Sequence, residues 1–274
     1  MFRGSAVIKR LTLLGLFLFT AFFCLVLDSE AATIRISSPK VQLKAAPGET
    51  YAGEITAENP TEEEAKVKIY LEDWVYASGG TGQKNFSPMG TTPLSAAKWI
   101  TFSPAEDVIK PFGRTVVHYT IQIPQDAKGT HYAVLFFETI IGSTKDEEGV
   151  NVMVAGRIGS LFYVEVKGLA ERKGEVKSVE LKPSTGNKPL EIVTTFHNMG
   201  NTDITLGGNF LIMDKPGKVV GRGDVDKVYT FPGATESSTT QWVGRLPKGV
   251  YSMLLTYDLG EGKSLVEEKS LRIE

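Results

Sequence analysis

The longest regular pattern of hydrophobic and polar positions runs from Val150 to Val166. Hydrophobic side chains occupy alternate positions in this stretch: Val150, Val152, Val154, Ile158, Phe162, Val164 and Val166. A period of two predicts a β-strand with one apolar face. The strand is about three times longer than usual, so we expect a bend near 156–159. Either all its valines face the core of their own domain, or one half is open to another chain.

Shorter segments of the same kind fill the rest of the chain. In the first half they span 34–36, 41–43, 51–57, 65–76, 115–123 and 132–141, and in the second half 176–181, 190–197, 209–214, 239–243, 251–258 and 265–273. Turn residues rich in Gly, Pro and Asn separate them, and no segment has a convincing helical period. The pattern predicts an all-β chain of two tandem immunoglobulin-like antiparallel β-sandwich domains, 33–169 and 174–274.

The two halves repeat one local arrangement. Lys128-Gly129 is followed closely by Tyr132, and Lys248-Gly249 by Tyr251. A tyrosine just after such a turn is typical of the tyrosine corner, in which the phenol bonds back to the backbone of the turn. We therefore expect a tyrosine corner in each domain. Trp74 is expected in the core of the first sandwich, with an exposed sugar-stacking platform as the alternative.

The N-terminal segment has the features of a secretory signal peptide. Arg3, Lys9 and Arg10 precede an apolar run from 11 to 27, and small residues follow near Ala31. We predict a signal peptide over residues 1–31 and export to the periplasm, with retention as an N-terminal membrane anchor as the alternative. The single cysteine, Cys24, lies inside this segment, so the mature chain is expected to have no disulfide and no membrane span.

The composition of the chain argues against some classes of binding partner. The chain has 42% hydrophobic and 23% charged residues and a net charge of −2, as in ordinary soluble domains. Its clusters of basic residues are too short to follow a nucleic acid backbone or a charged membrane surface. We therefore expect a protein partner, or a glycan, and no nucleic acid.

The sequence shows none of the residue patterns that we associate with a catalytic site. The three histidines, His118, His131 and His197, have no spacing that would gather metal ligands. A mature chain without cysteine has no thiol nucleophile, and no serine nucleophile motif occurs. The carboxylates show no pairing typical of glycoside hydrolysis. We predict that the protein is not an enzyme, has no catalytic or metal-binding residues and uses no cofactor.

Several stretches resemble the N-terminal domain of the periplasmic pilus chaperones. They are 34–43, Ala57-Glu58-Asn59, 70–74, Ile121 to Asp126, 132–138 and Arg157-Ile158-Gly159-Ser160-Leu161-Phe162-Tyr163. In that family the strand corresponding to 150–158 completes the unfinished sheet of a pilus subunit. The resemblance implies that Val150, Val152, Val154 and Ile158 are donated to a partner, with Arg157 beside them.

The chain also departs from this family. Family members hold the terminal carboxylate of the subunit with two basic residues, whereas Ser38 and Ser160 stand at those positions here, with Lys40 and Arg157 nearby. The segment 77–102 is longer than expected, and the half after Gly174 is not obviously the second domain of the family. The whole layout has a looser similarity to two-domain cell-surface proteins associated with WxL proteins.

These observations favour a non-enzymatic periplasmic protein that chaperones or assembles a pilus or another surface appendage by β-strand donation. The pilin-like subunit that it would bind is implied by the resemblance alone. The alternative is an extracytoplasmic scaffold that binds a folded surface protein or peptidoglycan. A strand edge at 150–158 that is open to a partner would distinguish the first function from the second.

Overall fold

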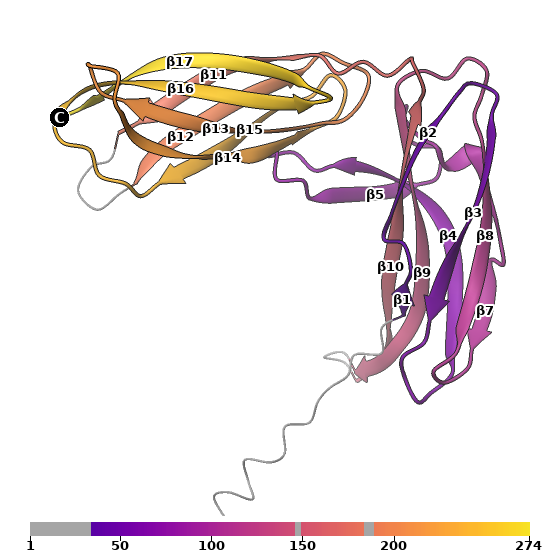
Figure 1. Cartoon of the computed structure of the whole chain (residues 1–274). Helices are drawn as coiled ribbons and strands as arrows, with labels where there is room; N and C mark the ends of the chain where they lie inside the picture. Colours follow the sequence, from indigo (N-terminus) through magenta and orange to yellow (C-terminus); the bar gives the residue numbers. More distant parts are fainter. Residues whose placement is uncertain (1–33, 146–148, 184–188) are drawn as a thin grey trace, which may run out of the picture.

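Two β-sandwiches make up the computed structural model, which describes residues 34–145, 149–183 and 189–274. They lie at an angle to each other, like the two arms of an L (Figure 1). The prediction of an all-β chain with two tandem immunoglobulin-like sandwiches is confirmed. The predicted signal peptide, 1–31, lies outside the described residues. Within the described ranges, no helix is long and apolar enough to cross a membrane.

The first domain has the two sheets of an immunoglobulin-like fold. Its described elements are β1 (Arg35–Ile36), β2 (Lys40–Ala45), β3 (Thr50–Glu58), β4 (Ala65–Tyr76), β5 (Lys84–Pro88), the short helix η1 (Ala97–Trp99), β6 (Ile100–Ser103), β7 (Glu106–Ile109), β8 (Arg114–Gln122), β9 (Thr130–Lys145) and β10 (Asn151–Val166). One sheet has the order β1-β3-β8-β6. The other has the order β2-β10-β9-β4-β5, and β7 also pairs with β4.

A hydrophobic core fills the space between these two sheets. Ile55, Ile121 and Phe137 have no exposed surface, and Phe162 of β10 packs with them. Along strand β8, buried side chains, among them Val117, Tyr119 and Ile121, alternate with more exposed ones, because successive side chains of a strand point to opposite faces. We call the face of each sheet that is turned toward this core its inner face, and the opposite one its outer face.

The second domain is a separate sandwich with its own core. Its described strands are β11 (Gly174–Lys182), β12 (Leu190–Asn198), β13 (Ile204–Met213), β14 (Val219–Thr230), β15 (Thr235–Trp242), β16 (Gly249–Gly260) and β17 (Lys263–Ile273). The sheets have the orders β11-β12-β15 and β14-β13-β16-β17. Phe196, Phe210 and Tyr257 are buried between them, and the Tyr257 hydroxyl is hydrogen bonded to Thr194 at 2.9 Å.

The tyrosine-corner prediction is correct in one domain and wrong in the other. In the second domain, the Tyr251 hydroxyl donates to the carbonyl oxygen of Pro247 at 2.8 Å. In the first domain, the Tyr132 hydroxyl instead donates to Asp203 Oδ1 of the second domain at 2.9 Å and accepts from the Asp203 amide at 2.8 Å. Tyr132 lies on the outer face of its sheet, so its phenol meets the neighbouring domain and not its own turn.

Trp74 is buried, but outside the core in which we expected it. It is 1% exposed and packs in a second cluster with Tyr132 and Tyr163 on the outer face of the sheet. Its ring lies 5.3 Å from that of Phe231 in the second domain, and its indole N–H donates to the Ala133 carbonyl at 3.0 Å. This burial also excludes the alternative of an exposed platform for stacking sugars.

The β4–β5 hairpin, whose loop and second strand belong to the long segment 77–102, extends onto the second domain (Figure 1). The Gly80 carbonyl accepts from the Tyr229 amide at 3.0 Å, and the Gly79 amide donates to Glu236 Oε2 at 2.7 Å. The ring of Tyr76 lies 5.5 Å from that of Tyr229. The insertion therefore helps to fix the angle between the two domains.

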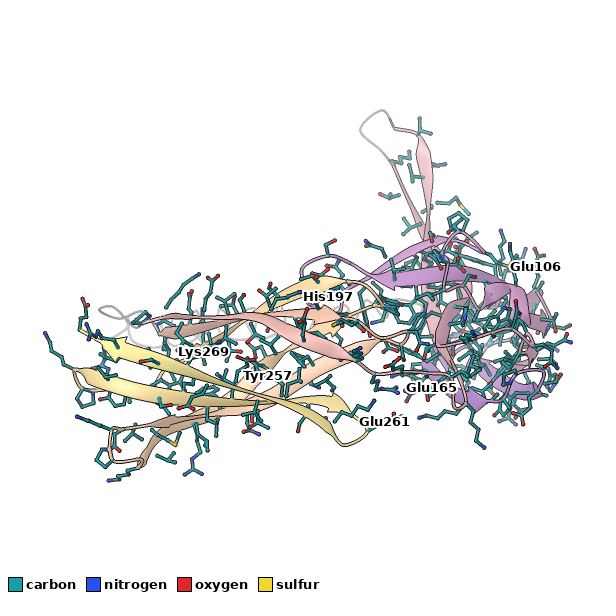
Figure 2. All side chains as sticks on the ribbon, turned by 90° about the horizontal axis from the view of Figure 1, so that it is seen from above. Glu106, Glu165, His197, Tyr257, Glu261 and Lys269 are labelled. Atoms are coloured by element: carbon teal, nitrogen blue, oxygen red, sulfur yellow. The ribbon has the colours of Figure 1, made fainter. Side chains whose placement is uncertain are left out.

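Ion pairs also join the two domains, near the linker between β10 and β11. Glu165 at the end of β10 accepts Lys44 at 2.8 Å and Arg172 at 2.9 Å, and both cations also pair with Glu261 of the second domain, at 2.8 Å and 3.1 Å. Figure 2 shows Glu165 and Glu261 near each other at the junction. Because several charges share these contacts, the network holds the domains more firmly than an isolated surface pair would.

Candidate functional site

Strand β10 has a neighbour on both sides along only part of its length. Strand β9 pairs with it from Asn151 to Glu165. On the other side, β2 pairs with it in parallel from Leu161 to Val166 only. In the part of the chain that the structure describes, no strand covers that side between Asn151 and Ser160. We call this side of β10, from Asn151 to Ser160, the free edge.

The outer part of the hairpin formed by β9 and β10 extends beyond the sandwich. We call residues 140–145 and 151–159 the arm. Its side chains are mostly exposed, whereas those of β10 from Ser160 onward are mostly buried. Figure 2 shows this hairpin projecting away from both domains. The arm therefore lacks the second sheet that covers the rest of β10.

The direction of the backbone groups on the free edge follows from the bonds farther along β10. The Leu161 amide donates to Pro39 and the Lys167 amide to Ala45, both on the β2 side, while the Val166 amide donates to Gly129 on the β9 side. Because successive amides of a strand point to opposite edges, the amides of Ala155, Arg157 and Gly159 are directed to the free edge. They are positioned to pair with an added strand.

The inner face of the arm carries the predicted row of apolar residues. Val152 is 41% exposed, Val154 39% and Ile158 36%. They have the same parity on β10 as the core residue Phe162, so the inner face of the arm continues the face of the core. Val150, just before the strand begins, is 57% exposed. The structure thus places Val152, Val154 and Ile158 on one face of β10.

Arg157, the fifth predicted partner-binding residue, lies on the opposite face. Its guanidinium donates to Glu72 Oε1 at 3.0 Å and to the Tyr70 hydroxyl at 3.2 Å. The guanidinium carbon also lies 4.0 Å from the centre of the Phe136 ring. These contacts hold Arg157 against the outer face of its own domain, so a role in binding a partner stays a prediction.

The structure also describes Ser38 and Ser160, the two positions that the sequence resemblance aligns with basic residues of the pilus chaperones. Ser160 is completely buried, and its hydroxyl has no hydrogen-bond partner among the described residues. Ser38 lies in the crossover between β1 and β2 and is half-buried. The ammonium group of Lys40 lies 4.1 Å from the centre of the Tyr163 ring. The basic residues near the site therefore belong to the outer face, away from the apolar row.

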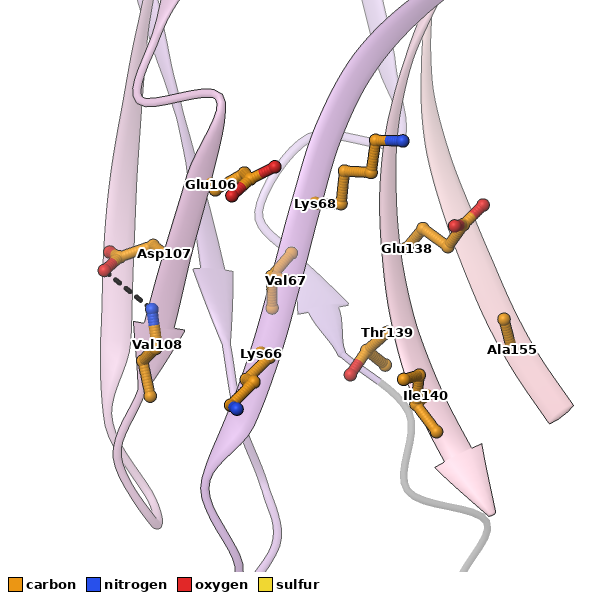
Figure 3. Close-up of a pocket in the computed structure, with 10 residues that line it drawn as sticks. All are labelled: Lys66, Val67, Lys68, Glu106, Asp107, Val108, Glu138, Thr139, Ile140 and Ala155. Carbon is orange, nitrogen blue, oxygen red and sulfur yellow. Dashed lines mark hydrogen bonds between the residues drawn. The ribbon is translucent and has the colours of Figure 1, made fainter. Parts of the chain in front are cut away.

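A shallow pocket of about 530 Å³ lies at the base of the arm. Figure 3 shows its lining, in which Val108, Ile140 and Ala155 are interspersed with charged residues of both signs. The Asp107 carboxylate accepts from the Val108 amide at 2.8 Å. Ile140 is 55% exposed here, so the outer face of the arm also offers exposed apolar surface.

Within the described residues, no group of three His, Cys, Asp or Glu side chains is arranged to hold a metal ion. The ring of His131 contacts that of Trp99 in a tilted arrangement, with ring centres 4.1 Å apart, and burial lowers the pKa of His131. His197 bonds to the Thr235 hydroxyl at 2.9 Å. His118 lies 3.8 Å from Glu54 on the surface. The three histidines are far apart in the topology and have separate local contacts.

One apolar residue of the inner face could not be found from the strand pattern. The register of β9 and β10 shifts between Val154 and Ala155, because Ile141 of β9 is an extra residue. This β-bulge lies just before the segment in which we expected the bend. A Cβ atom added to Gly156 would lie 3.2 Å from Ile141 Cγ2, which places Ile141 on the inner face.

Comparisons with known proteins concern the fold. No family model matches the chain, and no curated protein matches it. Similar solved structures include a chain of a chaperone–tip adhesin complex of CFA/I fimbriae, with 13% identity and a TM-score of 0.47, covering 87% of this chain and 99% of that chain. The class 5 fimbriae chaperone CfaA has 13% identity and a TM-score of 0.46, covering 86% and 99%. A chain of the CsuC–CsuE chaperone–tip adhesion subunit complex of Acinetobacter baumannii has 14% identity and a TM-score of 0.42, covering 86% and 98%.

Proposed function

We propose that this protein is a non-enzymatic periplasmic chaperone or assembly factor for the subunits of a pilus or another surface appendage. It would act by strand donation: the arm adds β10 to the unfinished sheet of a pilin-like partner. The observation that carries the proposal is the free edge from Asn151 to Ser160, bordered by an apolar face.

The backbone supports this mechanism first. An extended partner segment beside the free edge would satisfy the outward amides and carbonyls of β10, as in other cases of β-strand addition. Each such hydrogen bond contributes about 1 kcal/mol net. These bonds have no sequence preference, so they provide affinity without choosing the partner.

The apolar side chains of β10 would determine which partner binds. Val152, Val154 and Ile158 each keep more than a third of their surface exposed in the free protein. Burial of the remaining apolar surface of one such side chain stabilises a complex by roughly 1 kcal/mol. A groove in an incomplete sheet, lined by apolar side chains at the spacing of a strand, is the partner surface that fits this row.

The test is to isolate the tagged protein intact from the periplasm of its source cells and to weigh its complexes by native mass spectrometry. Wild type is compared with the double variant Val152→Asp, Val154→Asp. We expect a stoichiometric subunit to accompany the wild type and to be lost from the variant, because each aspartate would bury a charge in the groove at a cost of several kcal/mol.

A matched control is Val219→Asp, Val220→Asp in the second domain. These valines are each 38% exposed, so the control adds the same charges at similar exposure. The control should keep the subunit, and circular dichroism should show all three proteins folded. Retention of the subunit by the arm variant, or isolation of the wild type alone, would contradict strand donation. A wild-type homodimer that the arm variant lacks would contradict the pilin-like partner.

A further inference from the structure

The inner face of the arm has a gap in its apolar row at Gly156. Positions 150, 152, 154 and 158 carry branched apolar side chains, whereas residue 156 has none. A partner groove that follows the strand pattern would meet an empty site there. Such a void would forfeit contact energy on both sides of the interface.

The neighbouring strand fills this gap. Regular pairing resumes with Gly142 opposite Val154 and Ile140 opposite Ala155, which leaves Ile141 without a paired position. A side chain that began at residue 156 would have its Cβ atom 3.2 Å from Cγ2 and 3.4 Å from Cδ1 of Ile141. The Ile141 side chain therefore lies over Gly156, on the same face as Val154.

The bulge also directs the side chains of two adjacent isoleucines to opposite faces of the arm. Ile140 is 55% exposed on the outer face, where it lines the shallow pocket with Ala155. Ile141 is 38% exposed, close to the values of Val152 and Val154. A bulge is a recognised way to redirect a side chain next to a functional edge.

We infer that Ile141 is a partner-contacting residue that determines specificity: it supplies from β9 the apolar side chain that β10 lacks at Gly156. This inference rests on the proposed strand donation. The partner it fits is an incomplete sheet whose apolar groove, at the level of Gly156, is wide enough on the β9 side to accept a branched side chain. A groove shaped for a single regular strand would be a poorer match.

Photo-crosslinking in the source cells tests this inference and captures whichever protein the arm contacts. The probe is benzoyl-phenylalanine, introduced one position at a time at residues 140, 141 and 154. We expect positions 141 and 154 to yield an adduct of the same mass, identified as the same protein by mass spectrometry, and position 140 to yield none. An adduct from 154 but not from 141 would overturn the inference while leaving strand donation in place. No adduct from any position would count against both.

A second measurement uses smaller changes, in case the bulky probe disturbs the bulge. With the crosslinker at position 158, Ile141→Ala and Ile140→Ala are compared at equal protein levels. Ile141→Ala should lower the adduct yield by about tenfold, as expected for the loss of a partly buried branched side chain. Ile140→Ala should leave the yield unchanged. Equal effects, or a larger effect of Ile140→Ala, would assign the contact to the outer face and refute the inference.

Discussion

Among single residues, the contact of Tyr132 with Asp203 is the most informative. The two side chains come from different domains, and two hydrogen bonds join them. Burial raises the pKa of the Asp203 carboxyl above its ordinary value of 3.8, although the nearby charges of Arg172 and Lys40 act in the opposite direction. Burial also raises the pKa of the Tyr132 phenol. Burial at the interface therefore disfavours the charged form of both groups, although the hydrogen bond from Tyr132 lowers the pKa of Asp203.

This arrangement predicts a pH-dependent effect of Asp203→Asn. Because the folded protein raises the pKa of Asp203, its stabilising effect is fully present below pH 3.8 and is lost as pH rises through the folded pKa. The free energy of unfolding of wild type, relative to that of the variant, should therefore fall as the pH rises above 3.8. Urea unfolding at several pH values measures this difference.

Glu175→Gln is the control for that experiment. A hydrogen bond from Lys177 lowers the pKa of the Glu175 carboxyl, so its stabilising effect is present above its ordinary pKa of 4.5 and is lost as pH falls. The two variants should thus differ from wild type with opposite pH trends. A constant difference between wild type and Asp203→Asn would contradict the raised pKa.

Among the elements, β10 combines two different environments in one strand. Its C-terminal part lies between β9 and β2 inside a sandwich, and its N-terminal part is an arm with one free edge. Long, exposed apolar edges invite pairing with other chains, and proteins usually protect them with charges or prolines. The free edge from Asn151 to Ser160 contains no proline, and Arg157 is its only charged residue. The free edge therefore has little of the usual protection against pairing with another chain.

Hydrogen exchange should reveal the free edge directly. In the isolated protein, the amides of Ala155, Arg157 and Gly159 should exchange roughly tenfold or more faster than those of Ile158 and Ser160, which are directed to β9. Addition of the partner should slow the first group selectively. The measurement is residue-resolved exchange by NMR. Equal protection of the two groups in the isolated protein would show that the edge is already paired.

At the scale of the whole molecule, the two sandwiches meet through three groups of contacts. An aromatic cluster, the β4–β5 hairpin and the ion pairs of Glu165 all join them. Phe231 is central to the cluster, since its ring lies 4.5 Å from that of Tyr132 and 4.9 Å from that of Tyr76. Such an interface should make the domains unfold together and hold them at one angle.

Phe231→Ala should therefore weaken the coupling between domains. Loss of this half-buried ring should lower the free energy of unfolding by about 2 kcal/mol, and calorimetry should show the unfolding transition broaden or divide into two. Phe112→Ala is the control, because Phe112 is 71% exposed and should have almost no effect. A single, unshifted transition in Phe231→Ala would show that this ring does not couple the domains.

The sequence alone determined the strand character of the chain and the parity of its long strand. Both are local properties: successive side chains of a strand point to opposite faces, so Val152, Val154 and Ile158 had to share one. The corner at Tyr251 was predictable for the same reason, because its turn is only four residues away. The number of domains followed from the recurrence of such strands and turns.

Only the tertiary structure decided what lies beside those strands. The pairing of β2 with β10 begins at Leu161, which creates the free edge, and no local signal in 150–166 specifies where a distant neighbour begins. Likewise, Tyr132 and Trp74 have the sequence context of core residues but face the second domain. The bulge at Ile141 depends on the register of two strands, and register is a property of their pairing, not of either strand alone.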